Sequence, residues 1–104
     1  MLKLFFHLFV PLYLCSGTFV FAQTIIPTWE VYNEANSFLP NNTVRCLEVD
    51  LNNGLWIGTD NGLAHLSNGV WEVFNTSNST IGDNYIRALA VDSSNNLWVG
   101  TTLN

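Results

Sequence analysis

The sequence predicts an all-β fold built from four-stranded antiparallel units. Three observations predict it: the chain repeats itself with a fixed period, short runs rich in β-branched, aromatic and leucine residues recur in each repeat, and Asn-Gly pairs separate those runs. Shifting the chain by 42 aligns Trp29–Gly62 with Trp71–Asn104, and 16 of the 34 pairs are identical without a gap. Helical solenoids share this period, but Gly, Pro and Asn clusters interrupt every candidate helical pattern.

The segment 1–22 has the pattern of a secretory signal peptide. A positively charged start precedes a mostly apolar run over residues 4–21, which ends in a small residue, Ala22. We therefore expect cleavage between Ala22 and Gln23. Pro11 and the polar interruptions argue against a transmembrane anchor, and the bulky residue before Cys15 argues against a lipoprotein signal.

The rest of the chain, 23–104, is acidic and holds one cysteine. It keeps Arg45 and Arg87 against all eight acidic residues, so nucleic acid and anionic membrane surfaces are poor partners. Cys46 has no partner for an intrachain disulfide in this part of the chain. At most one small domain fits this length, and its stability must come from something other than disulfides.

Within the repeat we expect strands at residues 44–49, 55–59, 63–66 and 70–74, two more strands between 85 and 101, and a strand at Trp29–Tyr32 that ends a preceding unit. Asn-Gly tolerates positive φ at both central positions of a tight turn. The pairs at 53–54, 61–62 and 68–69 therefore predict the turns of one four-stranded meander. Asn95-Asn96 replaces Asn53-Gly54 in the second copy and still reaches the left-handed region.

Both faces of this meander are apolar. Strict alternation directs Ile86, Ala88 and Ala90 to one face and Leu89 and Val91 to the other. A sheet buried on both faces stacks between neighbours, which is the arrangement of a blade in a β-propeller.

Trp56 and Trp98 occupy equivalent positions on the second strand of each unit, and we expect them to pack blade against blade. The strands add up to fewer than two blades, whereas propellers close with about four to eight. We therefore expect the chain to be an incomplete fragment of a propeller, from a truncated gene or a contig end. Residues 23–104 alone are expected to be insoluble or molten.

Two segments, LEVDLNNGLWIGTDNGLAHL (47–66) and LAVDSSNNLWVGTTLN (89–104), resemble the two-component regulator propeller repeat. That pattern has an Asp, a turn, a Leu-Trp-Ile-Gly-Thr strand, then Asn-Gly-Leu and an apolar strand. The resemblance extends over Trp29–Asn104, and the second copy departs from it at residues 102–104, where the first has Asp60-Asn61-Gly62.

The resemblance implies the periplasmic, ligand-sensing propeller of a hybrid two-component histidine kinase, often a sensor of glycans. Similar repeats also occur in exported propellers without a kinase. We expect a non-catalytic fragment of an exported sensory or ligand-binding propeller, periplasmic or extracellular, with the missing blades of the same protein as partners and no membrane contact after cleavage. The alternatives are a secreted structural or adhesion propeller and, more weakly, part of a glycan-acting propeller enzyme.

Two pairs of repeated polar residues are candidates for chemistry. Asp50 and Asp92 precede the turn, where a carboxylate accepts backbone N–H groups or, alternatively, contributes to a calcium loop. Arg45 and Arg87 could meet an anionic or sugar ligand in a central channel, but pairing with nearby acids is the favoured interpretation. A ligand is expected at the loop face, near connections such as 75–84.

The other candidates favour structural roles. His65 is expected to be structural because no second metal ligand has suitable spacing, and Cys46 aligns with an alanine, so a nucleophile is not expected. Trp29, Tyr32 and Trp71 are expected in the core rather than stacked on a sugar ring. The Asn-x-Ser/Thr sites at Asn41, Asn75 and Asn78 matter only in a eukaryotic secretory route. We expect no enzyme, cofactor or metal and assign no ligand-binding residue.

Overall fold

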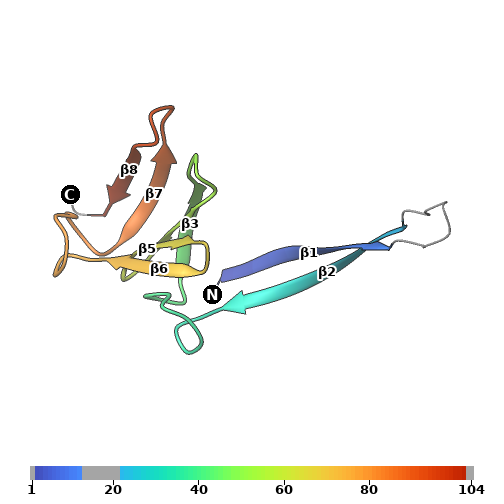
Figure 1. Cartoon of the computed structure of the whole chain (residues 1–104). Helices are drawn as coiled ribbons and strands as arrows, with labels where there is room; N and C mark the ends of the chain where they lie inside the picture. The colour runs from blue at the N-terminus through green and yellow to red at the C-terminus, as the bar shows by residue number, and fades with distance from the viewer. Residues whose placement is uncertain (1, 13–21, 103–104) are drawn as a thin grey trace.

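A computed structural model describes residues 2–12 and 22–102, and every helix-or-strand element there is a β-strand (Figure 1). The strands are β1 (Leu2–Leu12), β2 (Ala22–Tyr32), β3 (Val44–Val49), β4 (Leu55–Thr59), β5 (Gly62–Ser67), β6 (Val70–Phe74), β7 (Ile86–Val91) and β8 (Leu97–Thr101). They form three antiparallel sheets in the orders β1-β2, β3-β4-β5-β6 and β7-β8. The all-β prediction is confirmed. Across the described part of the chain, no helix offers the length and apolar character needed to cross a membrane.

The four-stranded sheet β3–β6, called here the first blade, is the meander that the repeat predicts. Three of its strands have the predicted bounds, and β5 extends one residue further at each end. Cross-strand pairing places two rows of side chains on opposite faces, Leu47, Ile57, Ala64 and Val73 on one and Glu48, Trp56, His65 and Glu72 on the other.

Only one of the three turns has positive φ at both predicted positions. Asn68 and Gly69 do, with φ of 50° and 77°. The connection over residues 50–54 is longer than two residues, and there Asn53 alone has a positive φ, 63°. The connection before β5 consists of residues 60 and 61, so Gly62 is already in the strand, with φ 121°. Asn95 reaches the left-handed region, as predicted, with φ 63°.

A bulge near the start of the first strand of each repeat overturns the predicted alternation. Pairing shifts register between Ile86 and Ala88, so the two side chains lie on opposite faces, and Ile86 shares the face of Leu89. The same shift occurs between Val44 and Cys46. Alternation fails here because a bulge inserts an extra residue that the apolar pattern does not reveal.

The sheet β7-β8, called here the second blade, packs across the first. Strand β7 contacts β3 and β4, and Ile86 is fully buried. On the other face of the first blade, Ile57 and Ala64 form a core with Leu39, and Tyr32 and Trp71 pack around it. The first blade is therefore contacted on both faces, by Leu39 and Tyr32 on one and by β7 on the other. Because Glu48, His65 and Glu72 lie on the face toward β7, the prediction of two apolar faces is wrong for that face.

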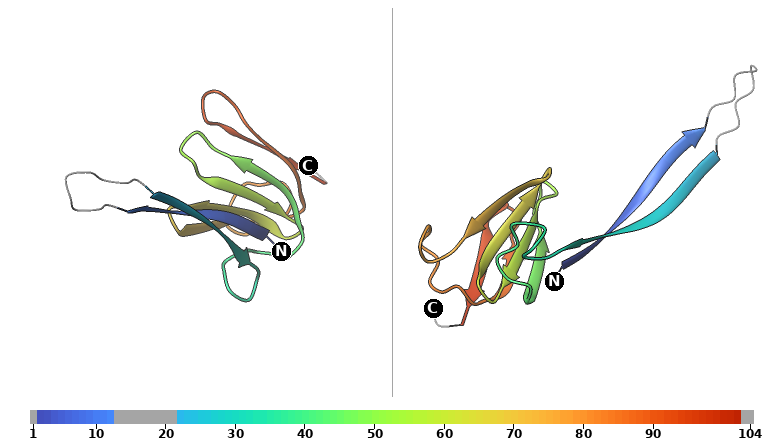
Figure 2. Two further views of the ribbon diagram at one scale, coloured as in Figure 1. Left: turned by 90° about the vertical axis from the view of Figure 1, so that its right-hand side faces the viewer. Right: turned by 90° about the horizontal axis from the view of Figure 1, so that it is seen from below.

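The strands β1 and β2 form a long antiparallel hairpin that projects from the two blades (Figure 2). Trp29–Tyr32 is a strand, as predicted, but it is the end of the longer β2 and pairs with Leu2–Phe5, so it does not end a blade in this structure. The expected cleavage site follows Ala22, the first residue of β2. Residues 13–21 of the expected signal peptide lie outside the described residues, and cleavage stays a prediction.

Candidate functional site

Trp56 lies on the face of the first blade that is turned toward the second blade. Its ring stacks on His65, with centroids 4.1 Å apart at 22°, and it tilts against Phe74 at 5.9 Å. Direct cross-strand pairing of Trp56 with His65 produces this stack. The expected role of Trp56 at the blade-to-blade contact agrees with this position. Trp98 differs, because 65% of it is exposed on the opposite face of the second blade.

Asp50 closes the turn before β4 and also holds His65. Its Oδ1 accepts the backbone N–H groups of Asn52 at 2.9 Å and Gly54 at 2.7 Å, which confirms the turn interpretation. Its Oδ2 lies 2.8 Å from His65 Nε2. The pKa of Asp50 is lowered, first by the Gly54 N–H and further by His65. The side chains are nearly buried, with 8% of Asp50 and 16% of His65 exposed.

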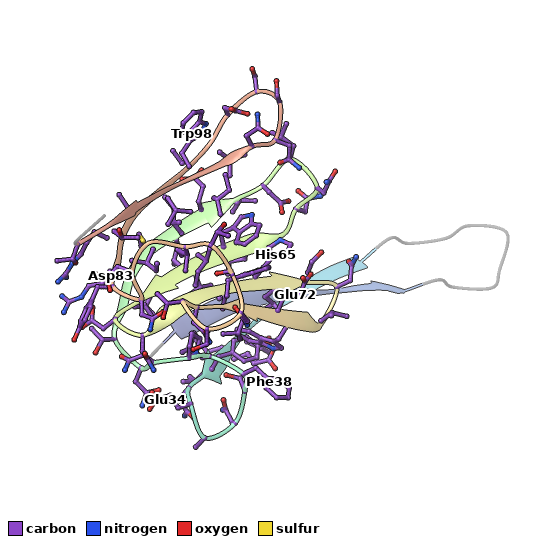
Figure 3. The ribbon with its side chains drawn as sticks, turned by 90° about the vertical axis from the view of Figure 1, so that its left-hand side faces the viewer. Glu34, Phe38, His65, Glu72, Asp83 and Trp98 are labelled. Carbon is purple, nitrogen blue, oxygen red and sulfur yellow. The ribbon has the colours of Figure 1, made fainter. Side chains whose placement is uncertain are left out.

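A second carboxylate faces the other nitrogen of the same imidazole. Glu72, directly opposite on β6, has Oε1 4.0 Å from His65 Nδ1, and the two lie on neighbouring strands in Figure 3. His65 therefore joins a buried acid at the turn to an exposed acid on the outer strand. The described residues contain no group of three or more His, Cys, Asp or Glu side chains placed to hold a metal ion.

Asp92 repeats the turn with a different partner. Its Oδ1 accepts the N–H groups of Ser94 and Asn96, both at 2.9 Å, which again confirms the turn interpretation. Its Oδ2 accepts the indole N–H of Trp98 at 2.9 Å. The Trp98 bond, then that of Asn96, lowers the pKa of Asp92 to about 2. The Trp98 indole thus bonds the Asp92 oxygen that is equivalent to the Asp50 oxygen bonded by His65 in the first blade.

Arg45 and Arg87 meet one carboxylate, that of Asp60. Arg45 donates from Nε and Nη2 to its two oxygens, both at 2.8 Å, which confirms the predicted acid partner. Arg87 Nη1 lies 3.9 Å from Asp60 Oδ1, so this acid links the two blades. Arg87 Nε also donates to Thr102 Oγ1 at 2.8 Å. The pKa of Asp60 is lowered, mainly by the Arg45 hydrogen bond.

A cavity of about 400 Å³ opens between the facing sheets, beside the connection from β6 to β7. Its wall combines aromatic rings with hydroxyl groups, among them Trp56, Phe74, Ser79, Thr80 and Thr101. The cavity adjoins the 75–84 connection, where the sequence predicts a ligand. Rings and hydroxyls together suit an amphipathic molecule, which buries one face and hydrogen-bonds along its edge.

That connection is folded by its own asparagines. Asn75 Oδ1 accepts the N–H groups of Ser77 and Asn78, and the Asn78 side chain bonds the N–H of Asn75 and the carbonyl of Val73. Two of the predicted glycosylation sites therefore have side chains engaged in the turn. In the same connection, Asp83 Oδ2 is buried without a hydrogen-bond partner.

Most remaining candidates are structural. Burial raises the pKa of the half-buried Cys46 thiol, the opposite of activation. Tyr32 and Trp71 pack edge to face with centroids 5.4 Å apart, within the core as expected. Trp29 is 67% exposed, so the core prediction is wrong for this residue.

Sequence reasoning missed the contact between Asp50 and His65. The pairing of β4 with β5 places His65 opposite Trp56, and Trp56 follows Asp50 by six residues in the sequence. The predicted Asn61-Gly62 turn gives a different register, with Trp56 opposite Ser67, because the actual connection consists of residues 60 and 61. Gly54 was a signal, because a Cβ there would meet both Asp50 Oδ2 and His65 Nε2.

These features define a class of protein: a four-stranded antiparallel blade of a β-propeller stacked on the first two strands of the next, with the aromatic ring of Trp56 between them and an Asp-closed turn in each. The family model described as two component regulator propeller matches residues 39–61 and 80–102, which contain the first two strands of each blade. These two segments are two-component regulator propeller repeats, so the chain contains two repeats of that family. Comparisons with curated proteins and with solved structures found no match.

Proposed function

We propose that the chain is a non-catalytic, ligand-binding segment of an exported sensory propeller, the input part of a two-component system. The match of both repeats to the two-component regulator propeller is the observation that carries this proposal. Kinase activity would belong to other parts of such a protein. The signal-peptide pattern of residues 1–22 supports export, with cleavage after Ala22.

The ligand that suits the cavity is a glycan or another small amphipathic molecule. A sugar ring presents an apolar face to aromatic side chains and hydroxyls along its rim. Trp56 and Phe74 supply the rings, and Ser79, Thr80 and Thr101 supply hydroxyl partners. The acidic charge balance supports a neutral ligand over nucleic acid or an anionic surface.

Binding is tested by thermal unfolding of the purified chain with a panel of neutral oligosaccharides, and a cooperative transition without ligand would itself overturn the expectation that residues 23–104 alone are molten. A ligand that binds only the folded chain raises its stability, by about 2.7 kcal/mol at one hundred times Kd. Thr80 lines the cavity, so Thr80→Ala should reduce the shift in Tm. Thr76→Ala, in the same connection outside the cavity lining, is the matched control and should retain it.

If no oligosaccharide changes the melting temperature, the ligand-binding proposal fails. A shift that Thr80→Ala leaves unchanged would place binding outside this cavity. Export is tested separately by expressing the whole sequence in a bacterium and determining the amino-terminal residue of the product. The proposal expects Gln23, and a product that keeps Met1 in the cytoplasm would contradict export.

A further inference from the structure

Where the two blades meet, the Ile86 side chain of the second blade fills the space above Gly58 of the first blade. Ile86 is fully buried against Gly58, where an added Cβ would lie 2.6 Å from Ile86 Cγ2 and would also meet Cys46 Sγ. Glycine at position 58 and a small residue at position 46 therefore make room for Ile86. This close approach fixes how β7 sits on β3 and β4.

Each half of that contact occurs a second time on an open surface of the chain. Gly100 and Ala88 are the equivalents of Gly58 and Cys46, and both are exposed. A Cβ at Gly100 would meet only atoms of Ala88, at 3.4 Å or more. Val44 is the equivalent of Ile86 and is only half-buried. The space and the side chain that would fill it are thus on opposite sides of the molecule.

Large apolar side chains surround both Val44 and the space over Gly100. We call Val44, Leu47 and Val49 the front face of the first blade, and Ala88, Ala90, Trp98 and Gly100 the back face of the second. Leu47 is 47% exposed and Val49 57%, while Trp98 is 65% exposed. Exposed apolar residues of this size gathered on opposite faces are typical of surfaces that bind protein.

The hydrogen bond between turns of the two blades also has an equivalent donor and acceptor elsewhere in the chain. The Leu51 N–H donates to Asn95 Oδ1 at 2.8 Å, from a turn on one blade to a turn on the next. The equivalent pair is Ser93 and Asn53, at the back and the front of the molecule. Asn53 and Asn95 have the same φ, 63°, so the acceptor is held in the same backbone conformation.

The chain that enters the first blade is folded like the chain that enters the second. Eight side-chain hydrogen bonds in and beside the 75–84 connection recur at the equivalent positions one repeat earlier, including Asn36 Nδ2 to the Val31 carbonyl and the Glu34 N–H to Asn42 Oδ1. Trp29–Tyr32 therefore leads into β3 as β6 leads into β7. Stacked by the same operation, these residues, which pair with Leu2–Phe5 in the single chain, would reach the fourth-strand position of another copy's second blade, separated from β8 by the position of the third strand.

We propose that the chain self-associates head to tail, with the front face of one copy on the back face of the next, repeating the blade-to-blade contact that it makes internally. Val44 enters the space over Gly100 of its neighbour, and the Ser93 N–H meets Asn53. The occupant is a second copy because both complementary halves belong to this chain and are related by the repeat that already packs within it. Such an interface is heterologous and builds a ring or an open filament.

The charge contact is not reproduced in this interface. Within the chain Asp60 joins Arg45 and Arg87, but Thr102 takes the position of Asp60 in the second repeat. Association is therefore driven by apolar burial and should change little between low and moderate salt. Each copy supplies strands at two blade positions, four in the first and two in the second, so closure at about four to eight blade positions needs about two to four copies.

The test uses the whole chain and two variants with a charge on one face each. Leu47→Lys blocks the front and Ala88→Lys blocks the back, and both positions are exposed in the single chain. By light scattering coupled to gel filtration, the parent should give a whole-number multiple of the chain mass and each variant alone should be monomeric. An equal mixture should form a one-to-one complex, because each variant retains the face that the other lacks.

Circular dichroism at low concentration serves as the folding control, since both variants should retain the parental β-sheet spectrum. A monomeric parent would overturn the proposal. An oligomer that is lost in only one of the two variants would also overturn it, because that result indicates a symmetric interface through a single face. Association that both variants leave unchanged would also overturn it.

Discussion

Gly58→Ala tests the contact on which the blade-to-blade packing depends. The new methyl group would lie 2.6 Å from Ile86 Cγ2 and 3.1 Å from Ile86 Cβ, whereas carbon atoms in ordinary contact are about 3.5–4.0 Å apart. The two sheets must therefore separate by roughly 1 Å at this point, since the packed atoms are less than that optimal distance apart. Ile86 is fully buried, so it has no solvent-facing rotamer into which to move.

The cost of such overpacking is about 1–3 kcal/mol. Replacing glycine also restricts the unfolded chain, which returns about 0.4–1 kcal/mol, so the net loss should be about 1–2 kcal/mol. For a domain of this size that corresponds to a fall in Tm of about 4–15 °C. The measurement is denaturant or thermal unfolding followed by tryptophan fluorescence, at a concentration below any self-association.

Two variants show how much of the loss comes from Ile86, since the new methyl group would also meet Cys46 Sγ within the first blade. Gly100→Ala is the same change in the other repeat, where the new Cβ would lie 3.4 Å from that of Ala88, and it should leave the stability of the single chain nearly unchanged. In Gly58→Ala/Ile86→Ala the extra methyl fills part of the space that the isoleucine leaves, so the double variant should lose less than the sum of the single losses. Equal effects of Gly58→Ala and Gly100→Ala, or additive losses in the double variant, would refute the reasoning.

Three further outcomes are expected. Ile57→Ala should lower the free energy of unfolding by about 2–5 kcal/mol, measured from the denaturant midpoint, because Ile57 is fully buried in the core of the first blade; a loss below about 1 kcal/mol would mean that this core is not formed. The pKa of Asp92 is about 2, below its ordinary value of 3.8, so its contribution is present above pH 4 and is lost as the pH falls toward 2. Trp98→Phe removes the indole N–H, and a carbon-detected NMR titration should then show a higher pKa for Asp92; an unchanged value would exclude the indole as the main cause. Gly54→Ala should move His65 away from Asp50, seen as a change in the His65 ring resonances, because the new Cβ would meet both side chains; unchanged resonances would contradict the assigned contact.

The sequence predicts the strands well because their signals are local. Short apolar runs between Asn-rich turns mark β3, β4 and β6 to the residue, and the internal repeat transfers that reading to β7 and β8. The turn roles of Asp50 and Asp92 follow for the same reason, since the carboxylate bonds backbone groups only two and four residues away.

What the sequence does not reveal depends on geometry between strands. The bulges near Arg45 and Arg87 leave no mark in the apolar pattern, yet they turn Val44 and Ile86 to the face opposite to the one that alternation predicts. Trp56 and Trp98 are equivalent in sequence but not in structure. Trp56 has His65 beside it on β5, whereas Trp98 bonds Asp92 and is exposed.

The repeat places equivalent contact residues one period of 42 residues apart, which constrains how the gene can change in length. A recombination that inserts or removes one period joins equivalent positions, so the new junction again sets a bulged first strand over the glycine of the preceding unit. The added unit packs through the same kind of interface as the existing units. Copy number can therefore change by whole units while the packing of the bulged strand over the glycine is kept, whereas a change by any other length would place Gly58 and Ile86 out of step.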